Sequence, residues 1–318
     1  MKLVVQIPCL NEQDTLPLVI NSIPKKIVGI DKIEILVIDD GSTDKTIAVA
    51  KKLGVKHFVH HTRNMGLAKS FSDGVMKALE MGADIVVNTD GDNQYPQADI
   101  PKLVKPIIDG RADIVVANRQ VNQIREFSWA KKGLQLLGSK VVNLAAGTDI
   151  PDAASGFRAY SRESVIALNI ITRFSYCMET IIQAGNKRLA ITSIPIKTNA
   201  KTRPSRLFKS TPEHVFKSTV AILRSLTMYK PYLLFITLGT LFLALGSVPF
   251  LRYLWFYFHH DSDGHIQSLV IGGLLLTCSL LSYVLGVIAD LVRINRILIE
   301  DQLTVSKREH LKSFRANN

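Results

Sequence analysis

Oxygen-bearing side chains gather in one short run, Asp90-Gly91-Asp92-Asn93-Gln94. Asp90, Asp92 and Gln94 could share a hard cation, because Mg²⁺ and Mn²⁺ prefer oxygen ligands and keep room for waters and phosphates. An isolated Asp-x-Asp is more often a solvated turn, since Asp-Gly favours turns. This run directly follows Val-Val-Asn-Thr at the end of a predicted strand, and that position favours the metal-binding interpretation.

Four further polar runs stand at the ends of apolar segments, and five such runs in register predict one binding site. They are Pro8-Cys9-Leu10-Asn11-Glu12, Asp39-Asp40-Gly41-Ser42-Thr43-Asp44, Arg63-Asn64 with Gly66, and Asn118-Arg119. Helix capping would explain Ser42 or Thr43. It does not explain two adjacent carboxylates, which could accept hydrogen bonds from a nucleobase or a ribose. The sequence contains neither GxGxxG nor GxxxxGK[ST], so it has no dinucleotide fingerprint and no P-loop.

The elements that must position these runs alternate between strand and helix. Segments rich in Val and Ile predict strands over residues 2–8, 33–40, 55–61, 84–90 and 113–119. Amphipathic stretches predict helices over residues 12–23, 43–53, 67–81, 97–109 and 127–145. This alternation predicts an α/β fold with a Rossmann-like, mostly parallel sheet, which binds ligands beyond the carboxyl ends of its strands.

Two long apolar runs, residues 231–251 and 266–289, contain no charged side chain. A bilayer core needs about 20 apolar residues of helix, so both runs predict membrane spans rather than buried core helices. Residues 201–230 carry seven Lys or Arg and residues 290–318 carry six, whereas the loop 253–265 carries none. By the positive-inside rule we expect both termini in the cytoplasm.

The chain is expected to have four parts. These are a soluble α/β domain over 1–200, interfacial amphipathic helices over 201–230, a two-helix transmembrane hairpin over 231–290 and a basic tail over 291–318. The net charge is +12, but the densest basic cluster adjoins a span, which favours a membrane surface over nucleic acid as the partner. Three cysteines exclude a disulfide framework, and the paired histidines at 60–61 and 259–260 have no ligand spacing and no expected role.

Five motifs together carry a resemblance to a known family: PCLNE, VIDDGSTDKT, RNMGLAKS, TDGDNQYP and DAASGFRAYSRE. Over about residues 1–210 the chain resembles inverting family 2 glycosyltransferases of the GT-A fold. Within these it is most similar to polyprenyl-phosphate glycosyltransferases, such as dolichol-phosphate mannose synthases and bactoprenol-phosphate glucosyltransferases. The QxxRW motif of processive polysaccharide synthases is absent from the sequence, which argues against polymerisation.

The resemblance implies roles for residues at the strand ends. Asp92 and Gln94 would ligate a divalent cation, Mg²⁺ or Mn²⁺, with Asp90 beside them, and Asp92 would count among the catalytic residues. Nucleotide contacts would come from Pro8, Asn11, Glu12, Asp40, Asp90 and Gly91.

On the acceptor side, Asp152 occupies the family position of a catalytic carboxylate. A lipid phosphate is largely dianionic at pH 7 and hardly needs a general base, so Asp152 could instead orient Arg158 or the acceptor. Guanidinium groups match phosphate bidentately. The candidates for the lipid phosphate are Arg119, Arg158, Arg203 and Arg206.

The implied activity is inverting transfer of a single hexose from a nucleotide sugar to polyprenyl phosphate. The bactoprenol subgroup suggests glucose from UDP-glucose; GDP-mannose, UDP-linked amino sugars and another lipid acceptor such as diacylglycerol stay open. The rival from another class is a non-catalytic membrane protein that binds nucleotide sugars. The expected location is a bacterial inner membrane, crossed twice, with homo-oligomerisation left open.

Overall fold

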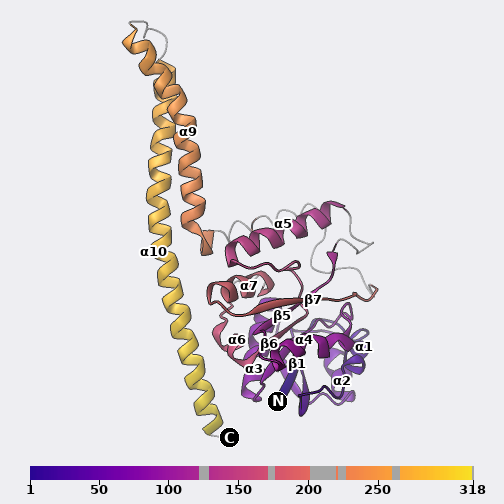
Figure 1. Ribbon diagram of the computed structural model, residues 1–318. Coiled ribbons are helices and arrows are strands. Elements are labelled where there is room, and N and C mark those ends of the chain that lie inside the picture. The colour runs from indigo at the N-terminus through magenta and orange to yellow at the C-terminus, as the bar shows by residue number, and fades with distance from the viewer. Residues whose placement is uncertain (122–128, 171–175, 201–219, 221–226, 260–265, 317–318) are drawn as a thin grey trace. The chain divides into compact units, whose positions relative to one another are not determined.

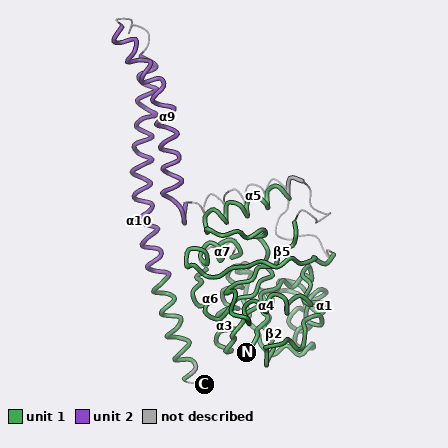
Figure 2. The backbone as a smooth tube through the Cα atoms, in the orientation of Figure 1, with its two compact units in different colours: residues 1–222, 301–318 green, residues 223–300 purple. Residues whose placement is uncertain are grey.

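The computed structural model describes residues 1–121, 129–170, 176–200, 220, 227–259 and 266–316. It divides the chain into two compact units, shown in Figure 2. Unit 1 comprises residues 1–222 and 301–318, and unit 2 comprises residues 223–300. The expected interfacial helices over 201–230 fall almost entirely outside the described residues.

Unit 1 is built on a seven-stranded sheet in the order β3-β2-β1-β4-β6-β5-β7 (Figure 1). All neighbouring strands run parallel except β6, which is antiparallel to β4 and β5. The mostly parallel sheet expected from the sequence is therefore confirmed. Its strands are β1 (Lys2–Cys9), β2 (Lys32–Asp39), β3 (His57–His60), β4 (Ile85–Asn88), β5 (Ile114–Asn118), β6 (Arg158–Ser161) and β7 (Ile191–Pro195).

Helices overlap all five segments that the sequence predicts to be helical, and two further helices, over residues 162–167 and 176–186, were not predicted. In unit 1 they are α1 (Leu16–Ser22), α2 (Thr46–Lys52), α3 (Leu67–Glu80), η1 (Gln97–Asp99), α4 (Ile100–Ile108), α5 (Trp129–Ala146), α6 (Arg162–Ala167) and α7 (Tyr176–Asn186). Gly54 and Gly82 follow α2 and α3 with φ of +83° and +80°, a conformation in which glycine has no Cβ penalty.

The strand order creates a crevice at one edge of the sheet. From β1 the chain first builds outward through β2 and β3, and then returns to place β4 on the other side of β1. Connections that leave β1 and β4 in opposite directions open a crevice beyond their carboxyl ends, which is where such sheets bind ligands. The polar runs that follow β1 and β4 lie at this point.

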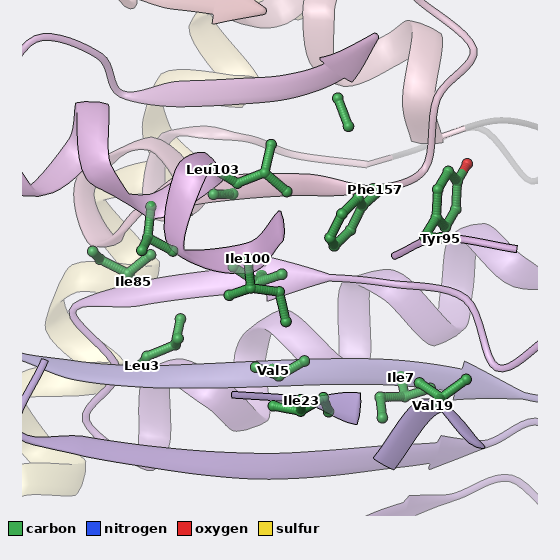
Figure 3. Packing of buried hydrophobic residues seen from close by; sticks show 14 of the residues in the cluster. Leu3, Val5, Ile7, Val19, Ile23, Ile85, Tyr95, Ile100, Leu103 and Phe157 are labelled. Carbon is green, nitrogen blue, oxygen red and sulfur yellow. The ribbon is translucent and has the colours of Figure 1, made fainter. Parts of the chain in front are cut away.

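A continuous apolar core fixes these strand ends (Figure 3). Leu3, Val5 and Ile7 lie fully buried on one face of β1, and Val4 and Gln6 are fully buried on the other, as expected for a strand that is covered on both faces. Tyr95 and Phe157 extend the core beneath the loops, with ring centroids 5.2 Å apart. Burying a side chain of this size contributes about 1.5–3 kcal/mol, so the loops start from strongly held strands.

Unit 2 contains α9 (Pro231–Phe258) and the first part of α10 (Ile266–Ala316). Both are long and apolar enough to cross a membrane. The two helices approach closely at small residues: a Cβ on Gly239 would lie 2.8 Å from the Tyr283 ring. The Ser279 hydroxyl also donates to the Gly239 carbonyl at 2.8 Å. Small residues that admit close helix contact are typical of membrane helix pairs.

The end of α10 packs on unit 1. Lys307 Nζ donates to the Leu168 carbonyl at 2.6 Å, and Arg308 pairs with Glu163 at 3.0 Å. Leu311 is only 4% exposed, which a single helix cannot achieve without a partner surface. The expected boundary at residue 291 thus falls inside α10, and residues 301–316 form part of unit 1.

We predict that Leu311→Ala destabilises unit 1 by about 2–4 kcal/mol, because it leaves a cavity at a buried contact. Thermal unfolding of the detergent-solubilised chain measures the effect. Leu303→Ala is the matched control, since Leu303 lies on the same helix and is 43% exposed. Equal small effects of the two substitutions would mean that the end of α10 contributes nothing to the stability of unit 1.

Candidate active site

The loop after β1 is tied to the loop after β2 by Asn11. Its φ of +55° lies in the left-handed region, which asparagine tolerates better than most residues. The Asn11 side-chain oxygen accepts from Thr43 N at 2.8 Å, and Asn11 N donates to Ser42 Oγ at 2.9 Å. Asn11 therefore holds two of the five polar runs together.

Glu12 links the same loop to the Asp-x-Asp run. It is buried, and its Oε2 lies 2.8 Å from the Thr15 hydroxyl, which also lies 2.7 Å from the Gly91 carbonyl. A Cβ on Gly91 would lie 3.0 Å from Cys9 Sγ, so the two loops are in close contact. Burial, followed by the charge of Glu12, raises the pKa of the Cys9 thiol well above its usual value.

Asp92 and Gln94 lie side by side and partly exposed after β4. Asp92 Oδ2 accepts from Gln94 Nε2 at 2.9 Å, and Asp92 Oδ1 accepts from Gln94 N at 3.1 Å. A Cβ on Gly156 would lie 3.3 and 3.4 Å from the two carboxylate oxygens of Asp90. Gly156 thus leaves the space that the Asp90 side chain needs.

A network of buried polar side chains forms hydrogen bonds with the backbone of Gly156. Asn88 Nδ2 donates to the Gly156 carbonyl at 2.9 Å and to the Tyr176 hydroxyl at 2.8 Å. Gln6 Nε2 donates to Asn88 Oδ1 at 2.9 Å, and Gly156 N donates to the Tyr95 hydroxyl at 3.0 Å. The sequence analysis missed this network, although an amide inside the apolar strand Ile-Val-Val-Asn was a usable signal.

Asp40 is buried and receives three hydrogen bonds from the loop before α3. Its Oδ1 lies 2.8 Å from Met65 N and 2.8 Å from His61 Nδ1, and its Oδ2 lies 2.9 Å from Gly66 N. The same loop crosses Gly41, where a Cβ would come within 2.6 Å of the Arg63 backbone. Asp40 and Gly41 therefore shape this loop.

His61 has a place in the site that the sequence analysis did not expect. Its second ring nitrogen, Nε2, lies 3.0 Å from Asp73 Oδ2, so the imidazole bridges two carboxylates. The pairing of β2 with β3 brings His61 next to Asp40, because the preceding residues, Asp39 and His60, are register partners. The adjacent pairs Asp39-Asp40 and His60-His61 are consequently neighbours, and His60 Nδ1 lies 2.7 Å from Asp39 Oδ2.

Asp152 pairs with Arg119 rather than with Arg158. Arg119 Nε and Nη2 lie 2.7 and 2.8 Å from the two oxygens of Asp152, a bidentate contact with a fully buried carboxylate. Although burial disfavours its charge, the neighbouring Tyr95 and the hydrogen bond to Asp152 raise the pKa of Arg119 overall. The guanidinium thus stays charged at the end of β5.

Arg158 lies in the interior with no exposed surface. Its donors go to the carbonyls of Ala153, Ser155 and Cys177 and to the Thr180 hydroxyl, each at 2.7–2.8 Å. It braces the segment that leads from Asp152 into β6. The other two acceptor candidates, Arg203 and Arg206, lie outside the described residues.

The buried phenol of Tyr95 is influenced electrostatically both by Asp90, in the loop after β4, and by the Arg119–Asp152 pair. Burial raises the pKa of its phenol, the charge of Arg119 lowers it, and the charges of Asp90 and Asp152 raise it. All three charged groups thus lie within electrostatic reach of one buried side chain.

The residues after β4 fit a hard cation. The donor set is two carboxylates and one amide, all oxygen ligands, and the space under Asp90 is kept open by Gly156. The part of the chain that the structure describes has no group of three His, Cys, Asp or Glu side chains placed to hold a metal. A cation here would therefore need ligands from water or substrate phosphates.

Comparisons with known proteins agree on one family. The family model described as glycosyl transferase family 2 matches residues 4–168. The UDP-N-acetylglucosamine–dolichyl-phosphate N-acetylglucosaminyltransferase of Methanococcus voltae is 30% identical over 213 residues, covering 60% of this chain and 83% of that protein. The polyprenol monophosphomannose synthase of Mycolicibacterium smegmatis is 28% identical, covering 60% and 74%.

Solved structures share the fold. The glucosyl-3-phosphoglycerate synthase of Mycobacterium tuberculosis, in complex with Mn²⁺, UDP and phosphoglyceric acid, superposes with a TM-score of 0.53 at 23% identity. The match covers 70% of this chain and 78% of that one.

We predict that Asp40→Asn loosens the loop before α3, because an amide cannot accept from both sides as the carboxylate does. Losing a hydrogen bond to a buried charged group costs about 1.5–3 kcal/mol. Hydrogen exchange at Met65 and Gly66 should accelerate, as measured by mass spectrometry. Asp14→Asn, at an exposed site, serves as the control. Unchanged exchange at both amides would remove the loop-holding role of Asp40.

Proposed function

The chain belongs to glycosyl transferase family 2, and from that premise we propose that it transfers one sugar from a nucleotide sugar to polyprenyl phosphate. Membership of the family makes the chain a glycosyltransferase. The lipid acceptor is supported by relatives named for dolichyl, polyprenol and undecaprenyl phosphates. The structural observation that carries the proposal is that the loops after β1, β2 and β4 are tied together at the carboxyl ends of their strands, with the Arg119–Asp152 pair at the end of β5.

The donor side is assigned to the loops after β1, β2 and β4. Asp90, Asp92 and Gln94 would hold a Mg²⁺ or Mn²⁺ ion, which, when bound, neutralises charge on a departing nucleoside diphosphate. Mn²⁺ in the structural neighbour of the same fold supports this choice of cofactor. Asn11 and Glu12 would contact the nucleotide, and they also help to tie the loops after β1, β2 and β4 together. Asp40 acts on the nucleotide chiefly through the loop that it holds.

The acceptor side is assigned to Arg119, oriented by Asp152. Arg119 presents its Nη1 edge to a phosphate, because Asp152 engages the Nε and Nη2 edge. Arg158 receives no acceptor contact in this proposal, since its guanidinium is buried and used by carbonyl groups. Arg203 and Arg206 keep the role suggested by the sequence.

The reaction is a single displacement. A phosphate oxygen of the lipid forms a bond to the anomeric carbon while the bond to the nucleoside diphosphate breaks, so the anomeric configuration inverts. The dianionic phosphate is already a nucleophile and gives up no proton. Both oxygens of Asp152 already receive hydrogen bonds from the guanidinium, which favours a positioning role over that of a general base. Holding the two substrates in this geometry supplies much of the rate enhancement.

The sugar is the least constrained part of the proposal. Relatives are named for mannose and N-acetylglucosamine, whereas glucose from UDP-glucose rests on the resemblance to the bactoprenol subgroup. A panel of UDP-glucose, GDP-mannose and UDP-N-acetylglucosamine, each with Mg²⁺ and either polyprenyl phosphate or diacylglycerol, tests the function directly. We expect transfer to polyprenyl phosphate from one donor. No transfer from any donor would reject the proposal and leave a nucleotide-sugar-binding protein.

The membrane arrangement is proposed from the two apolar helices and the distribution of basic residues. In it, α9 and α10 span the membrane as a hairpin, and both termini and the catalytic domain lie on the cytoplasmic side. Residues 201–230 would lie at the membrane interface. The basic flanks of the apolar runs support this orientation.

We predict that Asp92→Asn removes most activity without unfolding the domain, because it takes a charged ligand from a partly exposed site. Chelation by EDTA should do the same to the unsubstituted chain, and added Mg²⁺ should restore it. Asp99→Asn is the control, since Asp99 is an acidic residue shortly after the same loop. Full turnover in excess EDTA would refute the metal assignment.

We predict that Asp152→Asn raises the KM for polyprenyl phosphate about tenfold or more, because Arg119 loses its orienting partner. The KM for the nucleotide sugar and the shape of the pH profile should stay the same. A general base would behave differently: its removal would lower kcat and abolish the acidic limb of the profile. Measuring kinetics over a pH series therefore separates the two roles.

A further inference from the structure

His61 lies between two carboxylates that belong to different elements. Its Nδ1 lies 2.8 Å from Asp40 Oδ1, in the loop after β2, and its Nε2 lies 3.0 Å from Asp73 Oδ2, on α3. The side chains of His61 and Asp40 are only 10% and 8% exposed. A nearly buried imidazole thus has each of its nitrogens within hydrogen-bond distance of a carboxylate oxygen.

The two contacts together indicate the protonation state of the imidazole ring. A neutral imidazole has one nitrogen that donates and one that only accepts, and an ionised carboxylate has no proton to donate. With a neutral ring, one of the two contacts would therefore bring two acceptors together. Only the imidazolium ion donates to both carboxylates, so the geometry favours a ring with a proton on each nitrogen.

The charges around the ring agree with this state. Asp40 already accepts from two backbone N–H groups of the loop before α3, so both of its oxygens act as acceptors. Lys69 Nζ donates to Asp73 Oδ1 at 2.7 Å. The two carboxylates are matched by one ammonium group and one imidazolium, and these four side chains are electrically neutral only when His61 is charged.

The other titratable groups of the same segments are His60, Asp39 and Arg63. His60 Nδ1 lies 2.7 Å from Asp39 Oδ2, and Arg63 is exposed. Within the part of the chain that the structure describes, the Asp73 carboxylate has hydrogen bonds with His61 and Lys69 alone.

Asp73 is a rigid anchor for this contact, because α3 packs directly on β1 and β2. A Cβ on Gly74, the next residue, would lie 2.6 Å from Gln6 Oε1 and 2.8 Å from Ile38 Cδ1. The backbone of α3 is thus held against the sheet beside Asp73. His61 ties the start of the segment 61–66 to this helix, and Asp40 holds the end of the same segment.

We propose that His61, as an imidazolium ion, is a positioning residue for the nucleotide sugar: by joining Asp40 to Asp73, it fixes residues 61–66 beside the nucleotide site. This inference rests on the proposed function, in which Asp40 lies at the nucleotide. As the pH rises and the ring loses a proton, one of the two contacts loses its hydrogen. The segment then becomes freer, and the nucleotide sugar binds more weakly.

The protonation state can be tested on the full-length chain in detergent without any substrate. Nitrogen NMR spectra of the histidine rings are compared for the unsubstituted chain and for His61→Gln, which identifies the signals of this ring. We expect both nitrogens of His61 to carry protons at neutral pH. A ring with a single protonated nitrogen in the folded chain would overturn the proposal.

Kinetics test the positioning role. His61→Gln should raise the KM for the nucleotide sugar roughly tenfold, because it removes a charge-assisted contact with a nearly buried carboxylate. The kcat and the KM for the lipid acceptor should change little. His57→Gln is the matched control, since His57 lies on the preceding strand, 3.6 Å from Glu34. Equal effects of the two substitutions would reject the positioning role.

Two further variants separate the charge of His61 from its bulk. His61→Arg can donate to both carboxylates at every working pH, so the rise of the nucleotide-sugar KM with pH should disappear. Asp73→Ala should also abolish this rise, because a neutral ring can still donate to Asp40, and it should accelerate hydrogen exchange over residues 61–66. Glu80→Ala, at the other end of α3, is the control. A KM that rises with pH in Asp73→Ala as in the unsubstituted chain would overturn the proposal.

Binding of UDP and GDP, measured with Mg²⁺ and no acceptor, distinguishes this inference from the proposed function. Weaker binding in His61→Gln, with no transfer from any nucleotide sugar, would reject the proposed function and retain the positioning role. Transfer with an unchanged nucleotide-sugar KM in the folded variant would reject the positioning role and retain the proposed function.

Discussion

The geometry of the site depends on the hydrogen bonds that the Asn88 side chain makes. This side chain is fully buried at the end of β4, and its amide donates to the Gly156 carbonyl, two residues before antiparallel β6. Through Gly156 it determines where the Asp90 carboxylate can lie, and through Gln6 it is tied to β1. Leaving the buried Asn88 amide without its partners would cost about 1–3 kcal/mol, so its three hydrogen bonds hold β1, β4 and the segment before β6 in one arrangement.

The same network couples the packing of helix α3 to the position of Asp90 in the site. Tyr176, which receives a hydrogen bond from Asn88, stacks on Phe71 of α3 with ring centroids 4.1 Å apart. The position of α3 and the position of Asp90 are therefore not independent. The loop held by Asp40 leads into the same helix, so the donor-side loops share one support.

The sheet and both long apolar helices could be predicted from the sequence because each has a period or a length that few other structures share. Strand β6 could not, since it has four residues, begins with Arg158 and pairs antiparallel with strands distant in sequence. The Asp-x-Asp-x-Gln run was recognisable from its residue types. The contact of Asp40 with His61 was not, because it depends on the β2–β3 register. Arg158 shows a further limit: its residue type suits phosphate, but its guanidinium is buried and donates to the carbonyls of three other residues.

The hydrogen bonds between Asp40 and the loop before α3 affect how the preference for a nucleotide-sugar donor could be redesigned in such a chain. A substitution at Asp40 alone changes the support of Met65 and Gly66 as well as the chemical group that faces a ligand. Gly41 adds a steric constraint, because only glycine leaves room for the Arg63 backbone. Residues 39–41 and 61–66 consequently behave as one exchangeable cassette. A graft from a relative with another nucleotide preference should transfer both segments together.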